Sequence, residues 1–219
     1  MEMTLKGTAK RDYEPEIGEL NLTLSAEEPD QRESITQVGR LSSALTNCLD
    51  SMESRHQIEH WSMSTPMTWS WQVDERPKRR MYRTSMQVAI EFCDFSALSS
   101  FVLDWGGEPG CNLLEINWRL RSATEDTEKL SLLRQAVSNA MTKARQIADV
   151  TGVGELECLE VTDPHMMNVT GSDDGWHPGV TPRTMMGADV HPPSAVIEVK
   201  PERVSLSATI WARFAGHRL

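Results

Sequence analysis

The sequence predicts an α+β fold in which an antiparallel sheet carries two long helices and one short helix on one face. Several segments alternate apolar and polar residues with a period of two, which is typical of half-buried strands. Three other segments place apolar residues three and four positions apart, which is typical of amphipathic helices. The order of these elements repeats once along the chain. We therefore expect two β-α-β-β-like halves within one domain that spans residues 1–219.

The first half begins with a strand around residues 4–10, a polar turn and a second strand over 19–26. A helix is predicted over 30–53, because Asp30 and Glu33 have the spacing of a capping box. The apolar face of this helix consists of Ile35, Val38, Leu41, Leu45, Cys48, Leu49 and Met52.

A Trp-rich strand follows and is predicted to form a long antiparallel hairpin with residues 82–92. Pro66 has no N–H to donate, so this strand should lie at an edge or be bulged there. The apolar residues of the strand fall on one side of the alternation; they are Trp61, Met63, Met67, Trp69 and Trp71. Two interpretations remain open. This side is either core beneath the helices, or it extends beyond them and meets another subunit.

The second half is predicted to contain a short helix, a strand, a long helix and two more strands. Asp94 is the expected N-cap of the short helix, and Gly106 and Gly107 end it. The next strand has Leu114, Ile116, Trp118 and Leu120 on its apolar side. The long helix should run from about 125 to 150, with an apolar face of Leu130, Leu133, Val137, Met141, Ala144 and Ile147. The last two strands are expected near 155–161 and over 204–212.

Four alanines recur at every fourth position of the long helix: Ala136, Ala140, Ala144 and Ala148. Steps of four advance about 40° each around a helix, so this row should border the apolar face and pack closely on the sheet or on the helix over 30–53. Gly152 and Gly154 follow the helix and are interpreted as its C-cap and a tight entry into the next strand.

Composition restricts the possible partners and location. The net charge of −10 argues against nucleic acid or anionic membranes, and the basic residues 76–80 are interpreted as a solvated turn. The opening residues lack the apolar run of an export signal, and no segment is apolar enough to insert in a bilayer, so a soluble, cytoplasmic protein is expected. Cys48, Cys93, Cys111 and Cys158 are widely spaced and are expected to be reduced, buried thiols.

The sequence contains no nucleophile elbow, phosphate-binding loop or dinucleotide fingerprint. His56 and His60 would open a strand, where residues four apart lie roughly 13 Å from each other, too far to bind one metal ion. We therefore expect a protein that is not an enzyme, with no catalytic residues and no cofactor.

Residues 163–194 form a long segment rich in Pro, Gly, Met and His, without periodicity. Its thioether and imidazole groups are ligands that suit Cu(I), so an alternative function is a small-ligand or copper-binding module. The candidate metal ligands are His165, Met166, Met167, His177, Met185, Met186 and His191.

Taken together, five segments make the chain resemble the SIMPL-domain family, a family of bacterial proteins. These segments are residues 5–24, 82–104, 110–120, 136–161 and 200–214. The resemblance implies a non-enzymatic protein that forms homo-oligomers, since some relatives assemble into large rings, with possible protein partners and a link to oxidative stress or envelope physiology. The chain departs from the family in lacking the usual export signal and in carrying Ala9 where the family has a second glycine.

Overall fold

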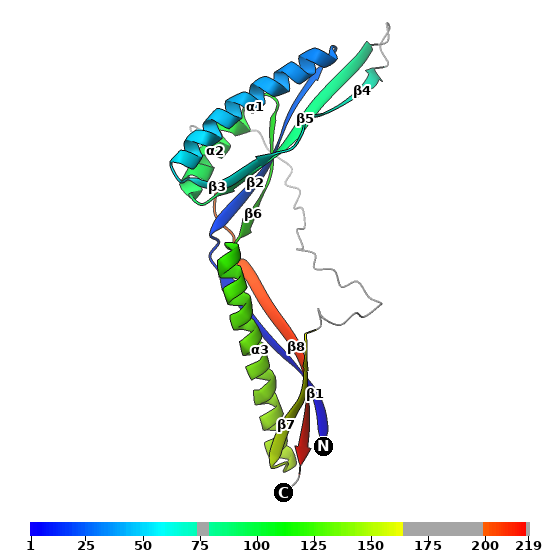
Figure 1. Cartoon of the computed structure of the whole chain (residues 1–219), viewed down its shortest axis with the longest axis vertical. Coiled ribbons are helices and arrows are strands. Elements are labelled where there is room, and N and C mark those ends of the chain that lie inside the picture. Colours follow the sequence, from blue (N-terminus) through cyan, green and yellow to red (C-terminus); the bar gives the residue numbers. More distant parts are fainter. Residues whose placement is uncertain (74–78, 164–198, 218–219) are drawn as a thin grey trace, which may run out of the picture. The chain divides into compact units, whose positions relative to one another are not determined.

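The computed structural model describes residues 1–73, 79–163 and 199–217. These residues form two compact units, each with its own antiparallel sheet (Figure 1). The α+β class and the three helices agree with the sequence prediction. The prediction of a single sheet is wrong, because the described strands divide into a five-stranded sheet and a three-stranded sheet.

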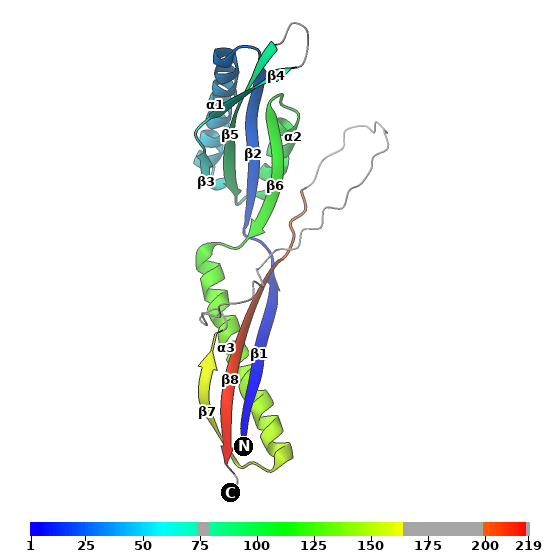
Figure 2. The ribbon, with the colours of Figure 1, turned by 90° about the vertical axis from the view of Figure 1, so that its right-hand side faces the viewer.

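The five-stranded unit contains two helices that pack on one face of its sheet (Figure 2). The strands lie in the order β3-β5-β2-β6, and β4 also pairs with β5. The elements are β2 (Ile17–Glu28), α1 (Gln31–Ser54), β3 (Ile58–Met63), β4 (Met67–Val73), β5 (Arg79–Phe92), α2 (Phe95–Gly106) and β6 (Cys111–Arg119). One apolar core joins both helices to the sheet; its fully buried members include Leu20, Leu22, Leu24, Leu45, Leu49, Ile90, Phe92 and Leu98.

Both helices of this unit have the predicted N-caps. The Asp30 carboxylate accepts hydrogen bonds from the backbone N–H groups of Arg32 (2.8 Å) and Glu33 (3.1 Å) at the start of α1. Asp94 accepts from Ser96 (2.9 Å) and Ala97 (3.2 Å) at the start of α2. These bonds satisfy backbone donors that have no partner within a helix.

The end of α1 differs from the sequence interpretation of the two histidines. His56 does not open a strand; it follows the helix with a φ of 57°, in the left-handed region. The Gln57 N–H donates to the Met52 carbonyl (3.0 Å) and the His56 N–H donates to the Glu53 carbonyl (2.9 Å), which is a Schellman motif. His56 therefore has a role in ending the helix.

The Trp-rich strand is interrupted at Ser64–Pro66, and the apolar side chains of its two parts lie on opposite faces of the sheet. In β3, Trp61 pairs with Ile90 and Met63 with Val88, both of which are buried beneath the helices. In β4, Trp69 pairs with Arg83, whose side chain lies on the other face. The register against β5 shifts by one residue between the two parts, and a shift of one residue moves a side chain to the opposite face. The prediction that all five apolar residues share one side is therefore wrong, while the edge position and irregularity at Pro66 are confirmed.

A buried network of hydroxyl groups fixes this register. Ser34 Oγ in α1 donates to Thr84 Oγ1 in β5 (2.5 Å), and Thr84 Oγ1 also lies 2.8 Å from Thr68 Oγ1 in β4. Ser34 and Thr84 are fully buried. Because buried hydroxyls need partners, the network favours the register that places Thr68 toward the helices and Trp69 away from them.

We expect Thr84→Val to lower the free energy of unfolding by about 1–2 kcal/mol, because it removes the shared partner of Ser34 and Thr68 without changing side-chain size much. Urea denaturation monitored by circular dichroism measures this change. The double variant Ser34→Ala/Thr84→Val should lose less than the sum of its two single variants, since both single variants remove the same Ser34–Thr84 hydrogen bond. Strictly additive losses would contradict the network.

A bulge in β6 exposes Leu114, a residue that the sequence predicts to be on the apolar side of the strand. Asn21 of β2 pairs with Glu115, but the next pair joins Leu22 to Leu113, so Leu114 has no partner in the ladder. The Leu113 side chain packs against the core and Leu114 is 55% exposed. The prediction that Leu114 shares the apolar side with Ile116 and Trp118 is wrong, because the extra residue shifts the alternation.

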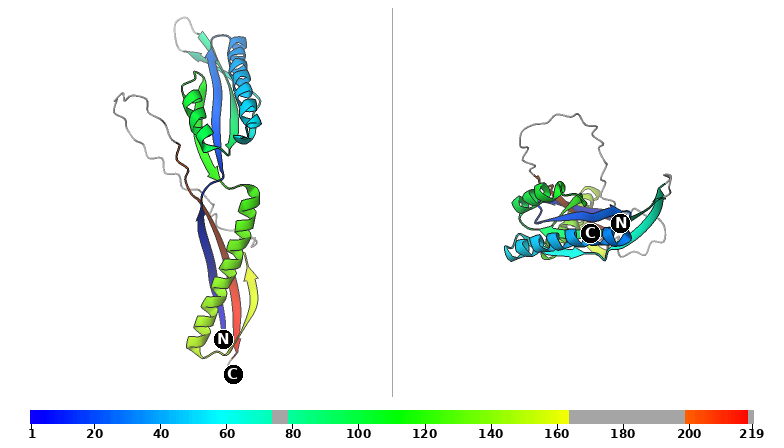
Figure 3. Two further views of the ribbon diagram at one scale, coloured as in Figure 1. Left: turned by 90° about the vertical axis from the view of Figure 1, so that its left-hand side faces the viewer. Right: turned by 90° about the horizontal axis from the view of Figure 1, so that it is seen from above.

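The three-stranded unit has the strand order β1-β8-β7 and is covered on one face by α3 (Figure 3). Its elements are β1 (Glu2–Tyr13), α3 (Ser122–Thr151), β7 (Glu155–Thr162) and β8 (Val204–His217). The helix α3 begins at Ser122, three residues earlier than predicted. Just before it, the Glu16 carboxylate accepts a hydrogen bond from the Arg121 N–H (2.8 Å). At the other end Gly152 has a φ of +68° and the Val153 N–H donates to the Ala148 carbonyl (3.0 Å), which confirms the predicted glycine C-cap.

The alanine row lies at the centre of the packed face of α3. Ala136 and Ala140 are 0% exposed, and the rest of the core comes chiefly from β8, including Ile210 and Phe214. The helix therefore packs on the sheet, which is one of the two partners that the sequence predicts for the alanine row. The predicted apolar face is wrong in part: Leu130 is 58% and Ile147 36% exposed, whereas Leu132 is buried.

Gly7 in β1 shows why small side chains are needed at this contact. A Cβ atom added to Gly7 would collide with the backbone carbonyl oxygen of Ala136 and would lie 3.0 Å from the Ala140 Cβ atom. The helix backbone thus approaches the strand closely, and only Gly opposite Ala allows this distance.

Candidate interaction surfaces

β4 presents three large apolar side chains on the face of its sheet that carries no helix. Met67 is 68% exposed, Trp69 47% and Trp71 36%. Within the part of the chain that the structure describes, β4 pairs with β5 only, so its other edge carries no strand. The strand also contains no charged residue. We call Met67, Trp69 and Trp71 with this free backbone the aromatic edge.

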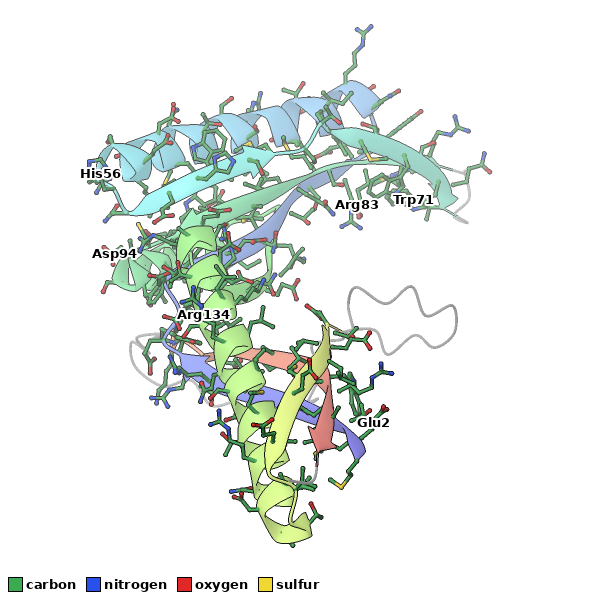
Figure 4. All side chains as sticks on the ribbon, turned by 60° about the horizontal axis from the view of Figure 1, so that its bottom comes forward. Glu2, His56, Trp71, Arg83, Asp94 and Arg134 are labelled. Atoms are coloured by element: carbon green, nitrogen blue, oxygen red, sulfur yellow. The ribbon has the colours of Figure 1, made fainter. Side chains whose placement is uncertain are left out.

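Basic side chains accompany the aromatic edge. The Arg83 guanidinium lies 5.7 Å from the centre of the Trp69 ring, within range of a cation–π contact, and its Nη1 atom is 3.4 Å from Glu27 Oε1. Figure 4 shows Arg83 and Trp71 together at this end of the unit. Arg79 and Arg80 pair with the last residues of β4 and are exposed. Two exposed basic residues therefore lie beside the aromatic edge, and the charge of a third, Arg83, is balanced by Glu27.

β7 is a second edge strand with exposed apolar side chains, and its charge is opposite. Leu159 is 41% and Val161 48% exposed. Glu155, Glu157 and Glu160 are exposed on the same strand, and Glu160 is 4.0 Å from Arg213 of β8. We call these five residues, two apolar and three acidic, the acidic edge. The sequence predicts a strand here, and its alternation of glutamate with apolar residues is a signal for an exposed acidic edge.

The rest of the uncovered face of the five-stranded sheet is polar. A depression there is lined by polar and apolar residues in equal number; its polar members are Asn21, Ser62, Ser64, Gln87 and Glu115. Farther along this face Arg119 bridges Glu91 (2.5 Å) and Glu19 (3.5 Å). Such side chains suit a hydrated contact surface.

The structure separates the candidate site residues. Trp61 and Met63 are half-buried and pack against the core, whereas Met67, Trp69 and Trp71 are exposed. The interpretation as core therefore fits the residues of β3, and exposure beyond the helices fits the residues of β4. The seven candidate copper ligands, from His165 to His191, lie outside the described residues.

The described residues contain no cluster of side chains that could hold a metal ion. No three His, Cys, Asp or Glu side chains gather there, and His56 and His60 are both exposed. All four cysteines are free, as predicted, but the prediction that they are buried is wrong: Cys158 is exposed and the other three are half-buried. Burial, with a smaller contribution from the Glu108 charge, raises the pKa of the Cys111 thiol.

Comparison with known proteins identifies the family. None of the described helices is long and apolar enough to span a membrane. A comparison with curated proteins gives no match. The model of the family described as SIMPL, a protein of unknown function (DUF541), matches residues 3–214, nearly the whole length of the chain. That match includes the strands, the alanine row and both edges, and the chain therefore belongs to the SIMPL family.

Proposed function

We propose that the protein is a non-enzymatic scaffold that assembles into a homo-oligomer through the aromatic edge. The observation that carries this proposal is the exposure of Met67, Trp69 and Trp71 on one uncharged edge strand. Natural proteins usually protect edge strands with charges, prolines or a covering element, because a free edge is a template for pairing with another chain. An edge with large aromatic side chains and no charge is consistent with a strand that has a partner.

The energetics support a contact of this kind. Fully burying one large apolar side chain stabilises a complex by about 1.5–3 kcal/mol, and these three side chains are already partly covered, so each offers roughly half of that amount. Tryptophan is among the residues that contribute most at protein interfaces. Backbone hydrogen bonds along β4 would add affinity, as in other cases of strand addition. A link of this assembly to oxidative stress or envelope physiology is part of the proposal and rests on the family resemblance.

Multi-angle light scattering at micromolar concentration tests the proposal. We expect the wild-type chain to have the mass of an oligomer, and Trp69→Ala/Trp71→Ala to reduce that mass toward the monomer. The matched control is Ile35→Ala/Leu103→Ala, which removes two exposed apolar side chains from the helices, 44% and 43% exposed, and should leave the mass unchanged. A monodisperse wild-type monomer would refute the proposed function.

A further inference from the structure

The described part of the chain offers four sheet edges, one of which is formed by β3 and β4 in succession, and they differ in charge and apolar exposure. The β1 edge has mixed charge, because exposed Lys6, Lys10 and Arg11 are accompanied by Glu2 and Asp12 on the same strand. The β6 edge exposes one large apolar side chain, Leu114. Neither edge complements the aromatic edge. β7 does, because it combines exposed Leu159 and Val161 with three glutamates.

The two complementary edges also agree in length. β4 has 7 residues and β7 has 8, so the whole of one strand can pair along the whole of the other. In such a ladder the exposed apolar side chains of β7 would cover Trp69 or Trp71, and the glutamates of β7 would meet the arginines of β5. The guanidinium of Arg83 lies over the Trp69 ring and is paired with Glu27 of β2, so the positive charge that a partner strand would meet comes from Arg79 and Arg80.

We propose that the assembly is heterologous: the aromatic edge of one copy adds as a strand to the acidic edge of the next copy. This inference rests on the proposed function and specifies its geometry. Each copy carries one edge of each kind, so a bound pair retains one free aromatic edge and one free acidic edge. Contacts of this type continue from copy to copy and close as a ring or extend as a filament.

A symmetric contact between two aromatic edges is disfavoured by charge. It would bring Arg79 and Arg80 of both copies toward one another, whereas the heterologous contact places them near the β7 glutamates. Complementary charge at the rim also increases the rate of association and selects the register.

Mixing two blocked variants tests this inference. Trp69→Glu blocks the aromatic edge with a charge that Arg83 can neutralise, so the fold is retained. Glu157→Lys/Leu159→Lys blocks the acidic edge at exposed positions. Melting curves of both variants serve as the check of folding. We expect each variant alone to be monomeric and an equimolar mixture to have twice the monomer mass, because each supplies the edge that the other lacks.

Other outcomes distinguish this inference from the proposed function. If the wild type is an oligomer and the acidic-edge variant is also an oligomer, the proposed scaffold stands and the heterologous geometry is wrong. If the wild type is a monomer, the proposed function fails first.

A crosslink provides an independent readout. Cys158 is a free, exposed thiol in β7, and Ser70 is exposed in β4. We expect oxidised Ser70→Cys or Gln72→Cys chains to form a ladder of covalent multimers that disappears when Cys158→Ser is added. Multimers that persist in the Cys158→Ser background, or the absence of crosslinks from both positions, would contradict the pairing of β4 with β7.

Discussion

Replacing Ala140 by leucine is expected to lower the free energy of unfolding by about 3 kcal/mol. Ala140 is 0% exposed, and its Cβ atom faces Gly7 across the closest approach of α3 to β1. Three additional carbon atoms have no space at this position, so the helix must move away from the sheet. That movement would also separate Ala136 and Ala144 from the strands beneath them.

Gly7→Ala tests the same contact from the strand. The new Cβ atom would collide with the backbone carbonyl of Ala136, and a helix backbone cannot move aside as a flexible side chain can. We therefore expect a loss of about 2–3 kcal/mol from one added carbon atom. Urea denaturation monitored by circular dichroism measures both variants.

Ser138→Leu is the matched control for the helix variant. Ser138 is exposed on α3, two residues from Ala140 and therefore on a different side of the helix. Leucine favours a helix more than serine does, so this variant should be neutral or slightly stabilised. If Ser138→Leu and Ala140→Leu have equal stabilities, the alanine row is not the packed face.

The alanine row illustrates how much of the fold the sequence predicts. The spacing of four identifies the row as a packing element, and Gly152 correctly predicts where the helix ends. The apolar face predicted from the larger side chains is wrong in part, because close approach of the backbones, and not side-chain size, decides which residues face the sheet. Leu130 and Ile147 are larger than alanine yet exposed, since the helix and sheet backbones lie too near each other for large side chains at their centre.

The Trp-rich segment shows why the surfaces were harder to predict. Its five apolar residues all have odd numbers, from Trp61 to Trp71, and simple alternation places all of them on one face. The shift of register at Ser64–Pro66 results from pairing with β5, a later strand, and from the hydroxyl network around Thr84. Pro66 signalled an irregularity, but its effect on the face of Trp69 depends on that tertiary pairing.

Leu45→Ala should lower the free energy of unfolding by about 3–4 kcal/mol, whereas Leu114→Ala should change it by less than about 0.5 kcal/mol. The sequence assigned both leucines to apolar faces of regular elements. In the structure Leu45 of α1 is 0% exposed within the core of the five-stranded unit, and Leu114 is 55% exposed at the β6 bulge. The two variants remove the same atoms, so their difference measures burial directly.

Trp fluorescence during urea denaturation is a suitable measurement, because Trp61, Trp105 and Trp118 pack against the same core as Leu45. The slope of free energy against urea should remain equal in the two variants if only stability changes. The alanine at position 45 leaves a cavity that the rigid α1 and the three-leucine stretch of β2 cannot fill, which adds to the lost burial. A comparable loss for Leu114→Ala would mean that its side chain is covered in solution, and this part of the uncovered face of the sheet would then be occupied by a partner even in the purified protein.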